Sequence, residues 1–121
     1  MLRISKLRAA LCAAALAVGT AAAANTHEII IYDRGFFPET VYLDVGDTLK
    51  FTNWSGKTQH VIGKNDKWHV KWIGNNKSKT IKIWNTQSME FRRTTSSNKK
   101  YNKLNGQPRG FLSTSNPPLG F

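Results

Sequence analysis

The chain has 121 residues, a formal net charge of +11 and a single cysteine, Cys12. This length accommodates one small domain with one hydrophobic core, and a lone cysteine excludes both an internal disulfide and a thiolate metal cluster. The carboxylates are few and no Gly-x-Ser-x-Gly or His-Glu-x-x-His spacing occurs, so hydrolytic catalysis finds no support. We therefore expect a protein that is not an enzyme.

The first 24 residues are typical of a secretory signal peptide. Arg3, Lys6 and Arg8 precede an apolar stretch from Ala9 to Val18, and the alanines at 21–24 offer small residues to a signal peptidase. The apolar stretch is shorter than the roughly 20 residues that a membrane span needs. We expect a periplasmic or secreted protein whose mature chain contains no membrane span.

The mature region is patterned as strands. Apolar and β-branched stretches bounded by Gly, Asn and Asp predict strands at 27–32, 40–45, 48–53, 68–73 and 79–84. The second and third of these alternate on either side of Gly46-Asp47, which predicts a hairpin, and Leu49 and Phe51 of the third are expected to point inward. In the fourth, Trp68, Val70 and Trp72 share one face and are expected to point inward.

From Lys99 onward the pattern fades, because Asn, Lys, Gly, Ser and Pro dominate. We expect a sandwich over residues 25–98 and an irregular basic tail over 99–121, packed on the sandwich or free, with one strand near Phe111. The tryptophans are mostly core candidates, with Trp54 the one expected to be exposed in a loop.

Charge is distributed unevenly. Residues 25–49 carry one basic and five acidic side chains, whereas residues 50–121 carry fourteen basic and two acidic ones. Such a protein can dock on an acidic protein or an anionic envelope component, and a solvated basic surface is the simpler alternative. Nucleic acid is a less favoured partner because the protein is expected to be exported. The candidate contact residues are Lys99, Lys100, Tyr101, Lys103 and Arg109.

Within residues 27–63 the order of several short motifs is recognisable. The motifs are Phe37-Pro38, Val41, Gly46-Asp47-Thr48, Phe51-Thr52-Asn53 and His60-Val61. Together they resemble the first half of a cupredoxin of the plastocyanin and pseudoazurin type. The resemblance implies an all-β, Greek-key β-sandwich, and it places His60 at the first copper ligand.

The resemblance ends where the other copper ligands belong. The strand around Met89 aligns with the family's last long strand, which puts Arg93 at the cysteine position and Ser96 at the second histidine position, and no methionine follows Met89. A blue copper centre requires the thiolate, and an arginine brings a positive charge instead. We therefore expect the fold without blue-copper electron transfer.

A thiolate-free metal site is the alternative, and copper is the metal considered for it, although no cofactor is certain. His60 and His27 are the first candidates, and His69 and Met89 are weaker ones. His69 is expected to face solvent or the outer surface of its sheet. For His60 the competing interpretation is a histidine whose ring is satisfied by hydrogen bonds.

His27 depends on where the signal is cleaved. Cleavage after Ala24 would place this histidine third, so that the free amine, two amide nitrogens and the imidazole form a square-planar set suited to Cu(II) or Ni(II). Cleavage after Ala23 would place it fourth and destroy the set. Both positions satisfy the small-residue rule equally well.

Overall fold

The computed structural model describes residues 24–84, 89–115 and 117–118. Apart from Ala24, the expected signal peptide lies outside the described residues, and so does Cys12. None of the helices in the described ranges is long and apolar enough to cross a membrane. The elements are β1 (Thr26–Tyr32), β2 (Gly35–Phe37), β3 (Thr40–Tyr42), β4 (Thr48–Asn53), β5 (Gln59–Gly63), β6 (His69–Ile73), β7 (Ser78–Lys82), β8 (Met89–Thr94) and β9 (Arg109–Ser113), with 3-10 turns η1 (Lys64–Asp66) and η2 (Tyr101–Lys103).

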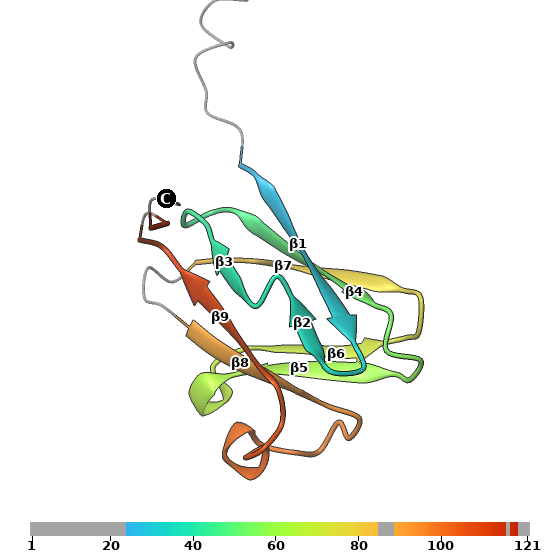
Figure 1. Cartoon of the computed structure of the whole chain (residues 1–121). Helices are drawn as coiled ribbons and strands as arrows, with labels where there is room; N and C mark the ends of the chain where they lie inside the picture. Colours follow the sequence, from blue (N-terminus) through green and yellow to red (C-terminus); the bar gives the residue numbers. More distant parts are fainter. Residues whose placement is uncertain (1–23, 85–88, 116, 119–121) are drawn as a thin grey trace, which may run out of the picture.

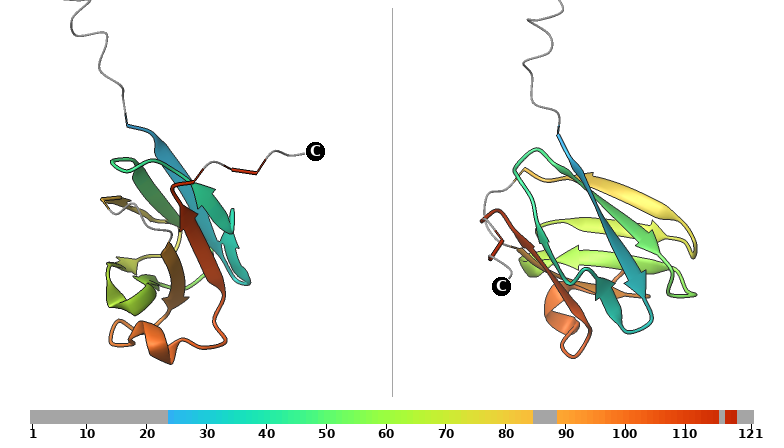
Figure 2. Two further views of the ribbon diagram at one scale, coloured as in Figure 1. Left: turned by 90° about the vertical axis from the view of Figure 1, so that its left-hand side faces the viewer. Right: turned by 45° about the horizontal axis from the view of Figure 1, so that its top comes forward.

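The strands form two sheets that face each other (Figures 1 and 2). One sheet has the order β2-β1-β4-β7 and the other has the order β3-β9-β8-β5-β6. β1 pairs with β4, and β3 with β9, in parallel, while the remaining neighbours are antiparallel. The expected all-β sandwich is confirmed.

Alternating side chains of β1 and β4 build the inner face of the first sheet. Ile29 and Ile31 of β1, and Leu49 and Phe51 of β4, are fully buried. Alternate residues of a strand point to opposite faces, so the expected inward direction of Leu49 and Phe51 is confirmed.

Phe91 of β8 lies at the centre of an aromatic cluster between the sheets. Its ring centroid lies 4.7 Å from that of Phe36, 5.5 Å from Phe51 and 5.8 Å from Trp68. The rings of Phe36 and Phe51 both meet Phe91 edge to face, an arrangement that aromatic side chains prefer. These contacts hold the two sheets together without a disulfide.

The predicted hairpin of residues 40–45 and 48–53 is wrong. β3 belongs to the second sheet and β4 to the first, so the segment between them crosses from one sheet to the other. Gly46, with φ +96°, donates its backbone N–H to the carbonyl of Ile83 at 2.7 Å. Alternation shows which face of a strand is apolar, but it does not show which strand lies beside it. Two alternating strands on either side of a turn therefore resemble a hairpin even when they belong to different sheets.

The expected inward direction of Trp72 is also wrong. β6 carries an extra residue opposite β5, because the paired residues shift between Gln59 and Val61. Trp72 adopts φ +61° at this bulge and is 62% exposed. The bulge breaks the two-residue period, so that Val70 and Ile73 are buried in its place.

Tryptophan contributes less to the core than expected. Trp84 is 74% exposed and joins Trp72 on the surface, whereas Trp68 packs against the core cluster. The expected exposure of Trp54 is confirmed at 64%. Three of these four large side chains therefore face solvent in the described structure.

The segment after Lys99 is irregular apart from η2 and β9. The strand expected near Phe111 is β9, and it lies between β3 and β8 inside the second sheet. Leu104 and Leu112 are buried. The tail therefore packs on the sandwich and supplies one of its internal strands.

Gly110 in β9 has no room for a side chain, which makes it a sensitive position. A Cβ at Gly110 would lie 2.1 Å from the Phe91 ring, so Gly110→Ala should lower the free energy of unfolding by about 1–3 kcal/mol through overpacking. Chemical denaturation measures the change. Gly74→Ala is the control, because its Cβ would meet only the flexible Lys77 side chain. Equal stability of the two variants would contradict the expected steric cost.

Candidate functional site

Arg93 lies at one end of the sandwich and points between the sheets. It pairs across the strands with Val61, a core residue, and cross-strand partners share a face. Only 6% of Arg93 is exposed. Its guanidinium donates to the carbonyls of Tyr32 and Asp33 in the turn between β1 and β2, and more weakly, at 3.4 Å, to that of Gly35.

The charge of Arg93 determines what this end of the molecule can hold. Burial lowers the pKa of Arg93, while the charge of Asp33 opposes this shift, but an arginine remains protonated in proteins. A positive group therefore occupies the position that the cupredoxin resemblance assigns to the copper thiolate. A metal cation is disfavoured there by charge as well as by the missing ligand.

A polar pocket of about 260 Å³ opens beside Arg93. Its walls include Lys57, which precedes β5, Gln59, the first residue of β5, and Thr95, which follows β8. Asp33 is the acidic residue of the lining. The expected second-histidine position, Ser96, donates its backbone N–H to the Thr94 hydroxyl at 3.1 Å.

His60 is buried on the opposite face of β5 from Arg93. It pairs with Thr94, one position beyond the Val61–Arg93 pair, and successive residues of a strand point to opposite faces. Nδ1 of His60 accepts the backbone N–H of Trp72 at 3.0 Å, and the Trp72 ring meets the imidazole edge to face at 4.7 Å. Arg93 therefore does not fill the space around His60; Trp72 does.

The surroundings of His60 keep its ring neutral. Burial lowers the pKa of His60, and the nearby charges of Lys71 and Lys79 lower it further. Lys79 reaches across from β7 to donate to the Lys71 carbonyl at 2.7 Å. A neutral ring that accepts a backbone N–H fits a structural histidine, because protonation of Nδ1 would break that bond.

The other candidate ligands do not gather around His60. Across residues 24–84, 89–115 and 117–118, no three His, Cys, Asp or Glu side chains form a group that could hold a metal ion. His69 is exposed, as expected. Met89 starts β8 and packs partly against the core.

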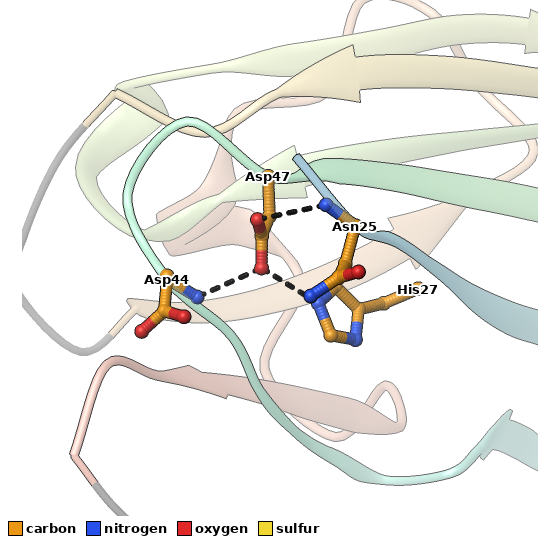
Figure 3. Close-up of polar contacts among 4 residues, drawn as sticks. All are labelled: Asn25, His27, Asp44 and Asp47. Carbon is orange, nitrogen blue, oxygen red and sulfur yellow. Dashed lines mark hydrogen bonds and ion pairs between the residues drawn. The ribbon is translucent and has the colours of Figure 1, made fainter. Parts of the chain in front are cut away.

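His27 joins a cluster around the buried carboxylate of Asp47 (Figure 3). His27 Nε2 lies 2.8 Å from Asp47 Oδ2, the Asp44 backbone N–H donates to the same oxygen at 3.0 Å, and the Asn25 backbone N–H donates to Oδ1 at 3.1 Å. The Asp44 N–H, the His27 ring and the Asn25 N–H lower the pKa of Asp47 against the effect of burial. The cluster attaches the start of β1 to the segment that crosses between the sheets.

Two of the proposed partner-contact residues are used within the fold. The Tyr101 hydroxyl donates to Glu90 Oε1 at 2.5 Å, and the Tyr101 N–H donates to Asp66 at 2.8 Å. Arg109 lies 3.7 Å from the same Glu90 oxygen. The Tyr101 hydrogen bond, followed by the nearby cations, lowers the pKa of Glu90. Lys99, Lys100 and Lys103 are exposed.

The sequence interpretation missed the pocket residues and the role of Asp47. Gln59 precedes His60 directly, and Ser55 follows Asn53 by two residues, a spacing at which an Asn side chain caps a turn. In the structure the Asn53 Oδ1 accepts the Ser55 N–H at 2.9 Å. The Asn53-to-Ser55 spacing could have indicated this turn. That Arg93 lines the same pocket could not be predicted from neighbouring residues, because Arg93 lies on another strand.

His60 predicts an acid-sensitive stability. The pKa of His60 in the folded protein lies below the ordinary value of 6.5. As the pH falls below 6.5, the unfolded chain therefore binds a proton at this histidine before the folded protein does. The contribution of His60 to the free energy of unfolding is complete above pH 6.5 and is lost as the pH falls toward the folded pKa. Between pH 7 and 5, the free energy of unfolding should therefore decrease less in His60→Asn than in the unmodified protein.

Asn retains a hydrogen-bond acceptor and does not titrate. His69→Asn is the matched control, since His69 is exposed, and it should keep the full pH dependence. Denaturant unfolding at each pH provides the measurement. An unchanged pH slope in His60→Asn would rule out this histidine as the source.

The described architecture is similar to that of solved cupredoxins. A purple cupredoxin from Nitrosopumilus maritimus is 11% identical over 73% of this chain and 98% of its own, with a TM-score of 0.58. A mutant plastocyanin of fern is 12% identical over 72% of this chain and 98% of its own, with a TM-score of 0.56. Auracyanin from Roseiflexus castenholzii is 15% identical over 77% of this chain and 98% of its own, with a TM-score of 0.52.

No protein-family model matches the chain, and no curated protein matches it. At these identities the solved structures establish the fold alone. The chain therefore has a cupredoxin-like β-sandwich fold, with no cysteine, second histidine or methionine at the positions that the resemblance assigns to copper ligands.

Proposed function

We propose that the protein is an exported, noncatalytic binding module that uses a cupredoxin-like sandwich without a blue copper centre. The observation that carries this proposal is the buried guanidinium of Arg93, bonded to the carbonyls of the turn between β1 and β2. Export to the periplasm or beyond is supported by the signal-like residues 1–24.

Two physical arguments oppose electron transfer through copper. A blue copper site needs a thiolate with two imidazoles, and His60 has its ring between β5 and Trp72 with 1% exposure. The guanidinium of Arg93 adds a fixed positive charge at the position that the resemblance assigns to the thiolate, and it lies on the opposite face of the sheet from His60. His60 cannot become a ligand without displacing Trp72, and a protonated guanidinium has no lone pair for a metal.

The excess of basic side chains supports an anionic partner. Lys99, Lys100 and Lys103 are exposed around η2, and fourteen of the basic residues lie after residue 49. An acidic protein or an anionic envelope component would be attracted over a distance set by the salt concentration. We therefore propose that the partner of the binding module is acidic or anionic.

The absence of a blue centre is directly observable. Protein loaded with Cu(II) should lack the intense visible absorption of a copper–thiolate site, because no thiolate is available in the mature chain. Absorption spectroscopy with metal analysis of the same sample tests this. His60→Ala is the matched variant and should leave any bound copper unchanged, because the ring is enclosed. An intense blue or purple band in the mature protein would overturn the proposal.

A second candidate function is the binding of a divalent metal ion at the mature amino terminus. The Asn25 nitrogen and His27 Nε2 lie 3.1 Å and 2.8 Å from the two oxygens of Asp47. Cleavage after Ala24 would turn the Asn25 nitrogen into a free amine, giving amine, imidazole and carboxylate donors at one place. The square-planar set that uses the Thr26 and His27 amides is less suited, because both residues pair with β4.

Sequencing the amino terminus of the exported protein determines whether this site can exist. Protein that begins at Asn25 should bind Cu(II) more tightly than protein that retains Ala24, because only the former has an amine at that position. Isothermal titration measures both, and His27→Ala should abolish the difference. His69→Ala serves as the control. Equal affinity of the two amino termini would remove this candidate.

A further inference from the structure

We propose that the pocket beside Arg93 binds a small oxyanion, either a carboxylate or a phosphate group. This inference rests on the proposed function, because it names the kind of ligand that a binding module with this fold would hold at the end of its sandwich.

Arg93 is a buried charge without an ion pair among the described residues. Only 6% of this residue is exposed, and the ion pairs found within the described ranges all join other groups. Its guanidinium donates to main-chain carbonyls, which are dipoles without a net charge, and the carboxylate of Asp33 acts on it only from beyond ion-pair distance. A buried charge without an ionic partner is costly, so an anion that reaches it is stabilised.

Hydrogen bonds to main-chain carbonyls orient the guanidinium of Arg93. An arginine has five N–H donors in a rigid fork, and the carbonyls of Tyr32, Asp33 and Gly35 account for three bonds. These bonds fix the group before any ligand arrives. The remaining N–H groups can donate to two oxygens of a carboxylate or of a phosphate.

The walls of the pocket are made of polar side chains. Gln59 is buried, and its side-chain amide donates to the Ser55 hydroxyl at 2.9 Å. That hydroxyl in turn donates to Asn53 Oδ1 at 2.7 Å. Lys57 and Thr95 add an ammonium and a hydroxyl to the lining. A volume of about 260 Å³ suits one small group and excludes a folded polymer.

Asp33 is the opposing charge at this pocket. It is exposed and lies in the lining, so it offsets part of the positive charge of Arg93 and Lys57. Replacing its carboxylate by an amide leaves its main-chain carbonyl on Arg93 in place. Asp33→Asn should therefore tighten oxyanion binding by several-fold, whereas removal of a positive charge should weaken it.

The experiment is a titration of the mature protein with inorganic phosphate and, separately, with acetate, at constant ionic strength set with chloride. Amide NMR spectra report both the affinity and the location. Saturating shifts should concentrate on residues 55–59 and 93–95. Lys57→Met should weaken binding by about tenfold, as expected for the loss of a charge-assisted hydrogen bond.

Lys103→Met is the matched control, because it removes the same charge from the exposed η2 turn and should change the affinity less than about twofold. Lys57 is exposed too, so its variant is expected to fold. Arg93→Met is a second variant that should abolish binding if it folds, and Lys57→Met and Asp33→Asn test the site independently of it.

The outcomes separate the ligand sources. Saturation by phosphate alone assigns a phosphoryl group, saturation by acetate alone assigns a carboxylate, and saturation by both assigns a general oxyanion site. Absence of saturation by either, or equal weakening in the Lys57 and Lys103 variants, would overturn the inference. Such a failure would not affect the absorption test with Cu(II). An intense blue or purple band in that test would overturn the proposed function, whatever the result of the anion titration.

Discussion

The buried guanidinium of Arg93 is the interaction on which the character of this molecule depends. It extends from β8 of one sheet to the carbonyls of Tyr32, Asp33 and Gly35 at the end of the other. A charge removed from water must be hydrogen-bonded to polar groups. The guanidinium of Arg93 therefore fixes the position of the turn between β1 and β2, whose carbonyls accept its hydrogen bonds. One side chain thus joins the two sheets and sets a positive potential at this end.

Of the two histidines first considered as ligands, His60 bonds the backbone directly, and His27 contacts a carboxylate that does so. His60 accepts the N–H of Trp72 and stabilises the bulge of β6. His27 contacts Asp47, whose carboxylate also accepts the N–H groups of Asn25 and Asp44. In each case a polar side chain satisfies main-chain groups at an irregular position, where the sheet ladder cannot do so. These hydrogen bonds stabilise the irregular positions of the sandwich.

Much of the fold could be predicted from the order of residues. Strand-forming stretches, the inward direction of Leu49 and Phe51, and the strand near Phe111 all follow from local periodicity, which depends only on neighbouring positions. The motifs from Phe37-Pro38 to His60-Val61 indicated the sandwich. The hairpin and the direction of Trp72 were wrong, because partner choice and a single inserted residue are decided by the opposite strand.

The sequence by itself determined the strands, the basic charge and the absence of cysteine after Cys12, because these are properties of composition and period. Only the tertiary structure decided that Arg93 and His60 lie on opposite faces of the second sheet, and that Ser55, Lys57 and Gln59 reach the same pocket as Arg93. The reason is that both facts depend on the register between β5 and β8, which a one-residue shift would reverse.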